Sequence, residues 1–365
     1  MKKDKIDFFT LIKILNYNAK YNIIIGERSN GKTYACLEYA IKKFVEKGEQ
    51  FIYLRRYDEA LKRSSGSKLF DSLIDNDVIA KITKGEFDKV TYRGREWYLS
   101  RYDEELKTEI LSAEPCAYGL ALNIAEHYKS YSYPKVTTVI FDEFLSREGC
   151  LTDEFVIFMN VLSTIIRGRT DVTIFMLGNT VNKYSPYFAE MGLTDIRNMK
   201  KGDIQLYRYG ESELSVAVQF SDSISKKGKP SDFYFAFGNP RLKMITGGDW
   251  ELDIYPHCPQ KFEKKDIIFI YFIVFAEDTL QCEIVQKGSD RFTFIHRKTT
   301  DLKNNQHDLI YTTAYDSKPN YRRKINMPAS ETEKKIYSFY KMDKIFYQDN
   351  EVGEIVRNYL NFCRE

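Results

Sequence analysis

The chain has 365 residues, of which 43% are hydrophobic, so it is long enough to build two domains with separate cores. Its net charge of +3 excludes a uniformly basic protein and restricts any nucleic-acid surface to a local patch. The six cysteines show neither CxxC nor His-paired metal spacing, and the longest apolar run, 267–276, is too short to cross a bilayer. The N-terminus lacks a signal-peptide core, so we expect a soluble cytoplasmic protein.

The first predicted element is a buried strand of three consecutive isoleucines, 23–25, and a glycine-framed loop follows it. Gly26 and Gly31 lack a Cβ, so the backbone N–H groups of the loop can converge on phosphate oxygens. Lys32 can neutralise the β- and γ-phosphates, and the Thr33 hydroxyl can ligate Mg²⁺. This Walker A pattern predicts ATP and Mg²⁺ as cofactors; the alternative is a glycine-rich turn that binds no ligand.

A helix is predicted directly after this loop, because apolar residues recur at helical spacing from Leu37 to Val45 and Gly48 can end it. The positive end of this helix would face the same anion. A further strand is predicted over 51–54. The order of strand, loop, helix and strand is the context that a phosphate-binding loop requires.

A second chemical signal is the apolar strand 137–143, which ends in two carboxylates and forms a Walker B pattern. The active site of a parallel sheet lies at the carboxyl ends of its strands, so Asp142 should emerge beside the Walker A loop. Asp142 would hold Mg²⁺ through a water, and Glu143 would orient and deprotonate the water that attacks the γ-phosphate. Acidic residues also end strands in solvent, but the upstream Walker A favours the catalytic interpretation.

Downstream, a helix is predicted over 153–166, ending in Arg167 and Arg169, and a strand over 172–177 precedes Asn179. The Asn179 amide could sense the γ-phosphate or the attacking water, because its strand should neighbour the Walker B strand. An arginine at the end of the helix could reach ATP bound to a neighbouring subunit and act as an arginine finger. The same cations could instead satisfy the carbonyls and dipole of the helix C-terminus.

Strand-like and helix-like segments alternate over residues 1–205, which predicts a P-loop ATPase domain with a parallel sheet. Turn residues interrupt the pattern over 206–255, where we expect a linker or hinge. Over 256–365, a meander of three strands precedes two helices, the first of which opens with the capping box 330–333. The predicted fold class is therefore α/β, followed by a smaller α+β domain.

Several runs taken together resemble the DNA-packaging ATPase, or genome encapsidation protein, of small podoviruses with protein-primed linear genomes. The runs are 26–33, 53–56, 133–136, 140–144, 164–169 and 177–180. The resemblance covers the first 200 residues well and implies a terminase-like P-loop fold of the ASCE class. It also implies a ring of five copies on the portal of an empty prohead in the infected bacterial host. Such a ring binds a structural prohead RNA and translocates double-stranded DNA.

The resemblance assigns roles to individual residues of this chain. Arg28 matches an arginine of the family that contacts nucleotide, and Ser29 and Asn30 belong to the same phosphate-binding loop. Arg167 falls on the trans-acting arginine finger of the family. Lys129 is a candidate for a second trans-acting basic residue, and Arg169 is a further one.

The second domain departs from larger terminases, which carry an RNase H-like nuclease with metal-binding carboxylates on its core strands. Its first predicted strand, 267–275, has no carboxylate, and Glu277 and Asp278 lie in the turn. We therefore expect a degenerate nuclease fold that binds nucleic acid without cutting it. Between Lys287 and Lys324, nine Lys or Arg stand against four Asp, which suits DNA or RNA phosphates but also a merely solvated surface. The candidates are Lys287, Arg291, Arg297, Lys298, Arg322, Arg323 and Lys324.

In the ATPase domain, Lys62, Arg63 and Lys68 in a Ser/Gly-rich segment are candidates to contact the DNA backbone, although the segment could equally be a surface turn. Three other functions remain open: another P-loop DNA translocase or helicase, a nuclease-active terminase, and a nucleotide-switched DNA-binding scaffold. The carboxylate-free strand disfavours the nuclease. Glu143 disfavours a scaffold that hardly hydrolyses ATP.

Overall fold

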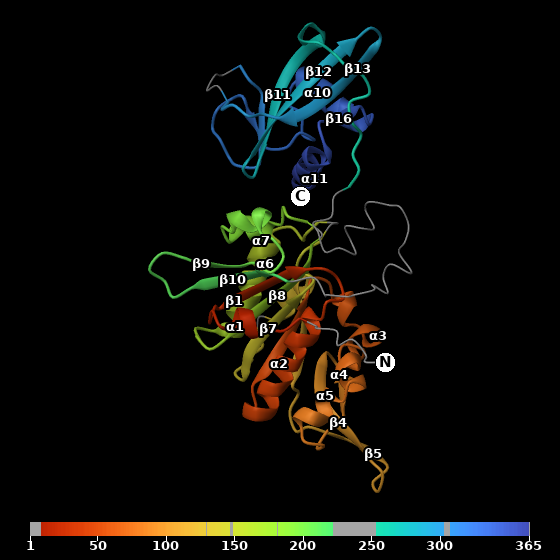
Figure 1. Cartoon of the computed structure of the whole chain (residues 1–365), viewed down its shortest axis with the longest axis vertical. Coiled ribbons are helices and arrows are strands. Elements are labelled where there is room, and N and C mark those ends of the chain that lie inside the picture. Colours follow the sequence, from red (N-terminus) through yellow and green to blue (C-terminus); the bar gives the residue numbers. More distant parts are fainter. Residues whose placement is uncertain are drawn as a thin grey trace, which may run out of the picture. The chain divides into compact units, whose positions relative to one another are not determined.

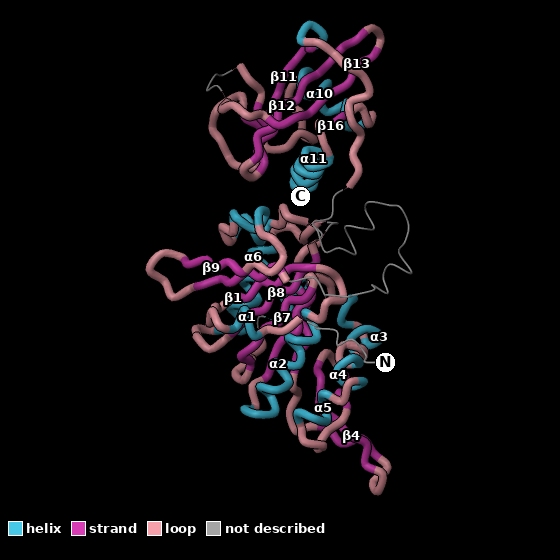
Figure 2. Tube along the Cα trace, in the orientation of Figure 1, coloured by secondary structure: helices cyan, strands magenta, loops and turns pink. Residues whose placement is uncertain are grey.

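The computed structural model describes residues 9–128, 130–146, 149–180, 182–221, 253–302 and 307–364. The chain divides into two compact units, Met1–Trp250 and Glu251–Glu365 (Figures 1 and 2). The first unit contains a ten-stranded sheet and the second a six-stranded sheet. Among the residues described, none of the helices is both long and apolar enough to span a membrane.

Six strands in the middle of the first sheet run parallel, in the order β6, β2, β7, β8, β1 and β10. Their bounds are, in the same order, Ala117–Ala121, Gln50–Arg55, Val136–Asp142, Thr173–Asn179, Tyr21–Gly26 and Ser215–Phe220. β1 and β7 are buried along their whole length, as expected of apolar strands inside a parallel sheet. Gly26 lies opposite Asn179, and Asp142 lies opposite Leu177, so the carboxyl ends of β1, β7 and β8 meet at one edge.

Antiparallel strands extend this sheet on both sides. On one side β9, Ile204–Arg208, pairs with β10. On the other side β3, Lys89–Arg93, and β4, Glu96–Asp103, form a hairpin whose β4 pairs with β6. A short strand, β5, Thr108–Leu111, pairs with β4. The hairpin and β5 belong to an insertion between β2 and β6 that the sequence pattern did not predict.

The expectation of a linker over 206–255 is wrong for its first part. β9 and β10 both lie in the first sheet, and the apolar run 216–220 of β10 is buried beside β1. The turn residues between the two strands gave the segment its loose appearance, although hairpins carry the same residues. Residues 222–252 of the expected linker lie outside the described residues.

Helices cover both faces of the first sheet, because successive strand residues point to opposite sides. On one face α2, Lys32–Lys47, packs its apolar side on Ile24, and on the other α6, Glu154–Ile166, packs with α7, Pro186–Glu190, over Ile23. The predictions of both long helices and of the strands next to them are confirmed. The shorter helices are α1 Ile12–Leu15, α3 Arg63–Gly66, α4 Asp71–Asp75 and α5 Val78–Ile82, with 3-10 turns η1 Asp58–Leu61, η2 Leu122–Tyr128 and η3 Thr194–Asn198.

The second unit orders its strands β15, β14, β11, β12, β13 and β16, with the meander β11–β12–β13 antiparallel as predicted. β14 pairs parallel with β11, and the RNase H-like assignment of this unit stays a prediction. Half of the predicted capping box is present: Ser330 Oγ accepts a hydrogen bond from the Glu333 N–H at 3.2 Å, while the Glu333 carboxylate accepts from the N–H of Ala329 at 2.9 Å. The bounds are η4 Lys264–Asp266, β11 Ile267–Phe275, β12 Asp278–Lys287, β13 Asp290–Arg297, β14 Ile310–Thr312, β15 Tyr321–Arg322, α10 Glu331–Lys341, β16 Ile345–Tyr347 and α11 Asn350–Arg364.

Candidate functional site

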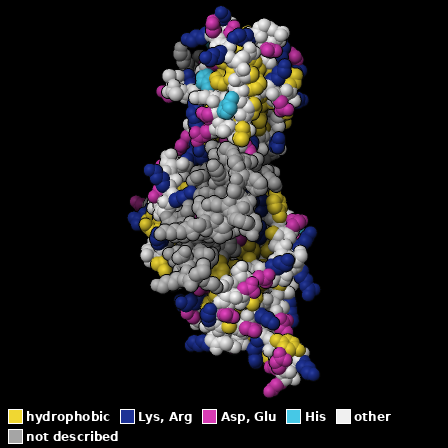
Figure 3. All heavy atoms as spheres, turned by 45° about the vertical axis from the view of Figure 1, so that its right-hand side comes forward, with side chains coloured by type: hydrophobic (Ala, Val, Ile, Leu, Met, Phe, Trp, Pro, Cys, Tyr) yellow, Lys and Arg dark blue, Asp and Glu magenta, His cyan; other side chains and the backbone are white. Residues whose placement is uncertain are grey.

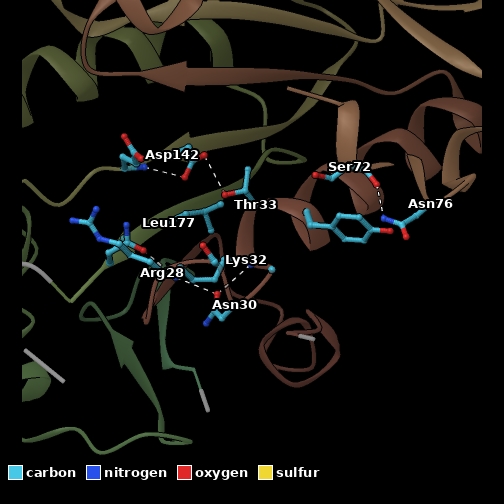
Figure 4. Close-up of a pocket in the computed structure, with 14 residues that line it drawn as sticks. Arg28, Asn30, Lys32, Thr33, Ser72, Asn76, Asp142 and Leu177 are labelled. Atoms are coloured by element: carbon cyan, nitrogen blue, oxygen red, sulfur yellow. Dashed lines mark hydrogen bonds between the residues drawn. The ribbon is translucent and has the colours of Figure 1, made fainter. Parts of the chain in front are cut away.

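The Walker A loop and the ends of β7 and β8 surround one pocket of about 780 Å³ (Figure 4). Residues 28–34 form one wall and 177–179 another, and Ser72 and Asn76 border the pocket from α4 and its end. Most of the residues predicted to bind nucleotide and metal line this pocket. They are Arg28, Ser29, Asn30, Gly31, Lys32, Thr33, Asp142, Glu143 and Asn179.

Ser221, the residue directly after β10, contacts the Walker A loop and the end of β1. The Asn30 side-chain amide donates to Ser221 Oγ at 2.7 Å, and the Ser221 N–H donates to the Ile25 carbonyl at 2.8 Å. A Cβ built on Gly26 would lie 1.9 Å from Ser221 Oγ. Gly26 is therefore required because Ser221 occupies the space that any side chain would need. The sequence pattern missed Ser221, which lies far along the chain in the segment expected to be a linker.

Gly26→Ala is expected to destabilise the protein by about 1–3 kcal/mol, the usual cost of overpacking, and to weaken ATP binding. The added Cβ must displace the Ser221 hydroxyl, which breaks its hydrogen bond with Asn30. Melting temperature and the Kd of a fluorescent ATP analogue measure the two effects. The double variant with Ser221→Gly should lose less stability than the sum of the two single changes; strict additivity would contradict the steric explanation.

The ammonium group of Lys32 is buried inside the loop. Its Nζ donates to the Glu27 carbonyl at 2.7 Å, to Asn30 Oδ1 at 3.2 Å and to Asn179 Oδ1 at 3.3 Å. Burial lowers the pKa of Lys32 to about 8, against the opposing effect of the Asp142 charge. Asn179 therefore lies at the end of β8 beside β7, as predicted, and it also accepts a hydrogen bond from Lys32.

Asp142 is the centre of a polar cluster at the end of β7. The Thr33 hydroxyl donates to Oδ2 at 3.1 Å (Figure 4), the Tyr53 hydroxyl donates to the same oxygen at 2.8 Å, and the Glu143 N–H donates to Oδ1 at 3.0 Å. Burial raises the pKa of Asp142, while the nearby Arg55 charge opposes this shift. A hydroxyl and a carboxylate oxygen this close together suit a hard divalent cation, so the pair fits Mg²⁺.

Glu143 extends from the same strand end in a left-handed backbone conformation, with φ +58°. Its side chain is 58% exposed and forms an ion pair with Arg55 from the neighbouring strand β2. Arg55 Nη1 also donates to the Tyr53 hydroxyl at 3.2 Å. Sequence reasoning gave neither Tyr53 nor Arg55 a role. Tyr53 and Arg55 lie two positions apart near the carboxyl end of β2, so their side chains point to the same face of the sheet beside the Walker B strand. That position could have indicated a role for both residues from the sequence.

The two arginines after α6 lie outside the pocket lining and have different surroundings. Arg167 is exposed and donates to the Thr164 carbonyl at 3.2 Å and to the Tyr131 carbonyl at 2.5 Å. Arg169 donates to backbone carbonyls that include Val136 at 2.6 Å and Pro134 at 2.9 Å. Arg169 therefore ties the end of α6 to the start of β7. Lys129 lies outside the described residues.

Two of the residues predicted to contact DNA, Lys62 and Arg63, lie beside arginines of the β3–β4 insertion. Lys62 and Arg63 line a surface pocket of about 410 Å³ together with Arg93 and Arg95 of the β3–β4 hairpin. Arg95 is paired with Asp58 at 2.6 Å, which orients its guanidinium at this pocket. Lys68 is exposed but does not line it. The cluster is basic because two separate segments meet, so spacing along the sequence could not reveal it.

The seven cations predicted to form one patch in the second unit come from three segments. Lys287 and Arg291 flank the β12–β13 turn, Arg297 and Lys298 lie at the other end of β13, and 322–324 lie on β15 and beyond. Lys298 lines one surface pocket together with Tyr321, so the second and third segments are neighbours. Arg297 is ion-paired with Asp278 and Glu351, and Arg322 with Glu333. On the face of this unit that Figure 3 shows, Lys and Arg side chains are mixed with Asp and Glu. Lys287 and Arg291 therefore lie apart from the other five cations, and the nucleic-acid role of those five stays a prediction.

The second unit lacks a recognisable nuclease metal site in its described part. β11 has the sequence Ile-Ile-Phe-Ile-Tyr-Phe-Ile-Val-Phe, without a carboxylate. Among the residues that the structure describes, no group of three or more His, Cys, Asp or Glu could hold a metal ion. Glu283 pairs instead with His296 across β12 and β13, at 3.4 Å.

Comparison with known proteins agrees with this site. A family model described as "Podovirus DNA encapsidation protein (Gp16)" matches residues 3–280. The "DNA packaging protein" of Bacillus phage PZA is 32% identical over 287 residues, covering 76% of this chain and 75% of that protein. The protein of the same name from Bacillus phage phi29 is 32% identical over 282 residues, with the same two coverages of 76% and 75%.

A solved structure extends the likeness in fold to both units. A chain of "The bacteriophage Phi-29 viral genome packaging motor assembly" matches with a TM-score of 0.58 and 22% identity, covering 96% of each chain. The family model spans more than half of the sequence, and the two relatives each cover more than two thirds of it. This chain belongs to the podovirus DNA encapsidation protein (Gp16) family.

Proposed function

We propose that this chain is the ATP-hydrolysing motor that translocates double-stranded viral DNA into a preformed prohead. The observation that carries the proposal is the convergence of a Walker A lysine, the Thr33–Asp142 pair and Glu143 in one pocket, in a member of the DNA encapsidation family. Hydrolysis requires a phosphate anchor, a metal site and a base within reach of one another. Lys32, the Thr33–Asp142 pair and Glu143, which supply these three functions in the proposal, lie together at the edge where β1, β7 and β8 end.

In the proposed reaction, the loop N–H groups and Lys32 bind the β- and γ-phosphates. Thr33 and Asp142 would hold Mg²⁺, which would supply positive charge beside the transferred phosphoryl group. Glu143 accepts a proton from the attacking water as the water oxygen bonds to the γ-phosphorus and the bond to the β–γ bridging oxygen breaks, giving ADP and phosphate. Glu143 must exchange its ion pair with Arg55 for this water, so Arg55 competes with catalysis.

The proposed motor is a ring in which each ATP site is completed by a neighbour. Arg167 is exposed and lies outside the pocket of its own chain, as a trans-acting finger must. We infer a homopentamer on the portal of the prohead, together with a structural prohead RNA, acting in the infected bacterial cell. The chain of similar fold from "The bacteriophage Phi-29 viral genome packaging motor assembly" supports assembly into a packaging motor.

DNA is proposed to contact the basic pocket of the insertion. Lys62 and Arg63 can bind phosphates without reading bases, as a translocating motor requires. Arg93 and Arg95 border the same pocket and are ion-paired with Glu109 and Asp58. Lys62→Gln with Arg63→Gln is expected to abolish DNA-stimulated ATP hydrolysis while the Kd for nucleotide is unchanged. The slope of log affinity for DNA against log salt should become shallower by about 0.9 for each phosphate that the variant no longer neutralises.

A matched control for this experiment is Lys42→Gln with Lys47→Gln on α2, where the side chains are similarly exposed, at 63% and 61%. The control should retain full stimulation by DNA. Equal stimulation of both double variants would exclude the basic pocket from the DNA path.

The test of the proposed function is steady-state ATP hydrolysis with and without double-stranded DNA, followed by DNA protection assays with proheads. Hydrolysis should rise with DNA, and prohead-protected DNA should appear only with hydrolysable ATP. An ATP hydrolysis rate that does not change on addition of DNA would contradict the proposed motor function. Cleavage of supercoiled DNA with Mg²⁺ or Mn²⁺ would favour a nuclease-active terminase instead.

A further inference from the structure

Arg56 follows β2 and is buried, with 7% of its surface exposed. Its Nε and Nη2 donate to the two carboxylate oxygens of Glu154, at 2.7 and 2.9 Å. Its Nη1 and Nη2 also donate to the backbone carbonyls of Glu143 and Phe144, at 3.2 and 2.5 Å. One guanidinium therefore joins the backbone that follows the Walker B strand to the first turn of α6.

Glu154 is fixed as firmly as its partner. Its side chain has no exposed surface, and besides Arg56 it accepts hydrogen bonds from the Tyr187 hydroxyl at 2.8 Å and the Leu151 N–H at 2.7 Å. Burial alone would lower the pKa of Arg56, but the hydrogen bonds and charge of Glu154 outweigh burial and raise it. A buried charge pair of this kind keeps one geometry, because separation would leave an uncompensated charge.

The backbone of Glu143 needs such support. Its φ of +58° lies in the left-handed region, which non-glycine residues occupy only when their surroundings hold them there. The side chain of Glu143 is 58% exposed and forms an ion pair with Arg55. The Arg56 contact with its carbonyl, at 3.2 Å, provides one restraint from a buried group.

α6 connects this pair to the proposed finger. Glu154 is the first of its 13 residues, and Arg167 is its C-cap, so the two lie about 20 Å apart along one helix. The ring of Phe158 on α6 packs 5.2 Å from that of Phe141 on β7 and 5.6 Å from that of Tyr187. α6 is therefore packed tightly beside the Walker B strand. Because the helix is rigid, a displacement of Glu154 at its first residue also displaces Arg167 at its far end.

We propose that Arg56 and Glu154 are positioning residues that link the Glu143 peptide to α6. The hydrolytic glutamate of one subunit and the finger that it presents to its neighbour then move together. The inference rests on the proposed function, since it takes Glu143 as the base and Arg167 as the finger. It adds a physical connection between two consecutive ATP sites in the ring.

The first test is Arg56→Lys, which keeps the charge but loses the planar fork that holds Glu154 and both carbonyls. We expect kcat for ATP hydrolysis to fall by about 10–100-fold, the effect of a misplaced catalytic group, while the Kd of an ATP analogue changes by less than about twofold. Unchanged kcat would overturn the positioning role. Should this variant fail to fold, Tyr187→Phe removes one donor to Glu154 and should lower kcat by about fivefold.

A matched control separates positioning from general loss of stability. Arg357 forms a comparable pair in the second unit with Glu354, whose side chain is 2% exposed. Arg357→Lys should lower the melting temperature and leave kcat unchanged. Equal falls in kcat for both lysine variants would mean that stability, not position, explains the result for Arg56.

The link to the neighbouring site is tested by complementation in DNA-stimulated rings. One subunit carries Arg167→Ala and the other Glu143→Gln, so each is inactive alone. Mixed rings should regain hydrolysis, because the intact Glu143 of the first can use the intact finger of the second. Glu154→Gln is then added to the subunit whose own Glu143 is already disabled. It should lower the regained activity by about tenfold, since it can act only through α6 and the finger.

The two possible failures are distinguishable. Regained activity that does not respond to Glu154→Gln would overturn the link through α6 while leaving the finger intact. A mixture that regains no activity would remove the finger itself, and with it both the interfacial site and this inference.

Discussion

Glu143→Gln is expected to lower kcat for ATP hydrolysis by about 10²–10⁴-fold, the contribution of a general base, without loss of nucleotide binding. The amide cannot accept the proton of the attacking water. The contacts of Asp142 with Thr33, Tyr53 and the Glu143 N–H do not involve the Glu143 side chain, so the metal site is retained. Single-turnover hydrolysis and the Kd of a fluorescent ATP analogue measure the two quantities.

The control for this variant is Glu46→Gln on α2, whose side chain is 54% exposed, close to the 58% of Glu143. It should hydrolyse ATP as the wild type does. Asp142→Asn should behave differently from Glu143→Gln, because it weakens Mg²⁺-dependent binding as well as turnover. Sustained turnover in Glu143→Gln would show that another group is the base.

Arg167→Ala is expected to lower hydrolysis by about 10³–10⁵-fold in a ring built only of variant subunits, as removal of an arginine finger does. In rings mixed with wild type, each variant subunit disables the ATP site of its neighbour. If the sites hydrolyse ATP in a fixed order, hydrolysis should fall more steeply than the fraction of variant subunits rises. Hydrolysis is measured over a series of mixing ratios. The exposed guanidinium donates to the carbonyls of Thr164 and Tyr131 in its own chain, and it can leave these neutral acceptors for a phosphate.

Arg169→Ala is the informative comparison, because it removes a guanidinium two residues away that donates to carbonyls at the end of α6 and before β7. It should reduce the melting temperature rather than the activity per folded ring. A strictly proportional decline with Arg167→Ala, or full activity of the pure variant, would return Arg167 to capping the end of α6.

The chemistry of the site could be predicted from the sequence because short segments determine it. The Walker A loop fixes the relation of Lys32 to Thr33 within its own turn, and parallel strands bring Asp142 and Asn179 to the same edge. These features depend on local backbone geometry and on one rule of sheet topology. Distance along the chain was therefore no obstacle.

The supporting residues could not be predicted in the same way. Arg56 meets Glu154 across 98 positions, and Asn30 meets Ser221 across 191, and neither pairing follows from spacing. The predicted basic patch of the second unit was affected for a related reason. The prediction grouped seven cations by their positions in the sequence, whereas they come from different strands of the second sheet and some are ion-paired with acidic residues. Pairing in three dimensions decides which charges are available to a ligand.

The position of Ser221 under the Walker A loop also bears on the order in which the chain folds. β1 and its loop leave the ribosome early, whereas β10 is among the last strands of its sheet to be synthesised. Until β10 pairs, β1 has an open edge, and unpaired edges of this kind favour association between chains. Because Asn30 of the Walker A loop donates to Ser221, which directly follows β10, we expect a chain whose β10 is not yet paired to bind ATP more weakly. Nucleotide affinity becomes a measure of whether the central sheet is complete.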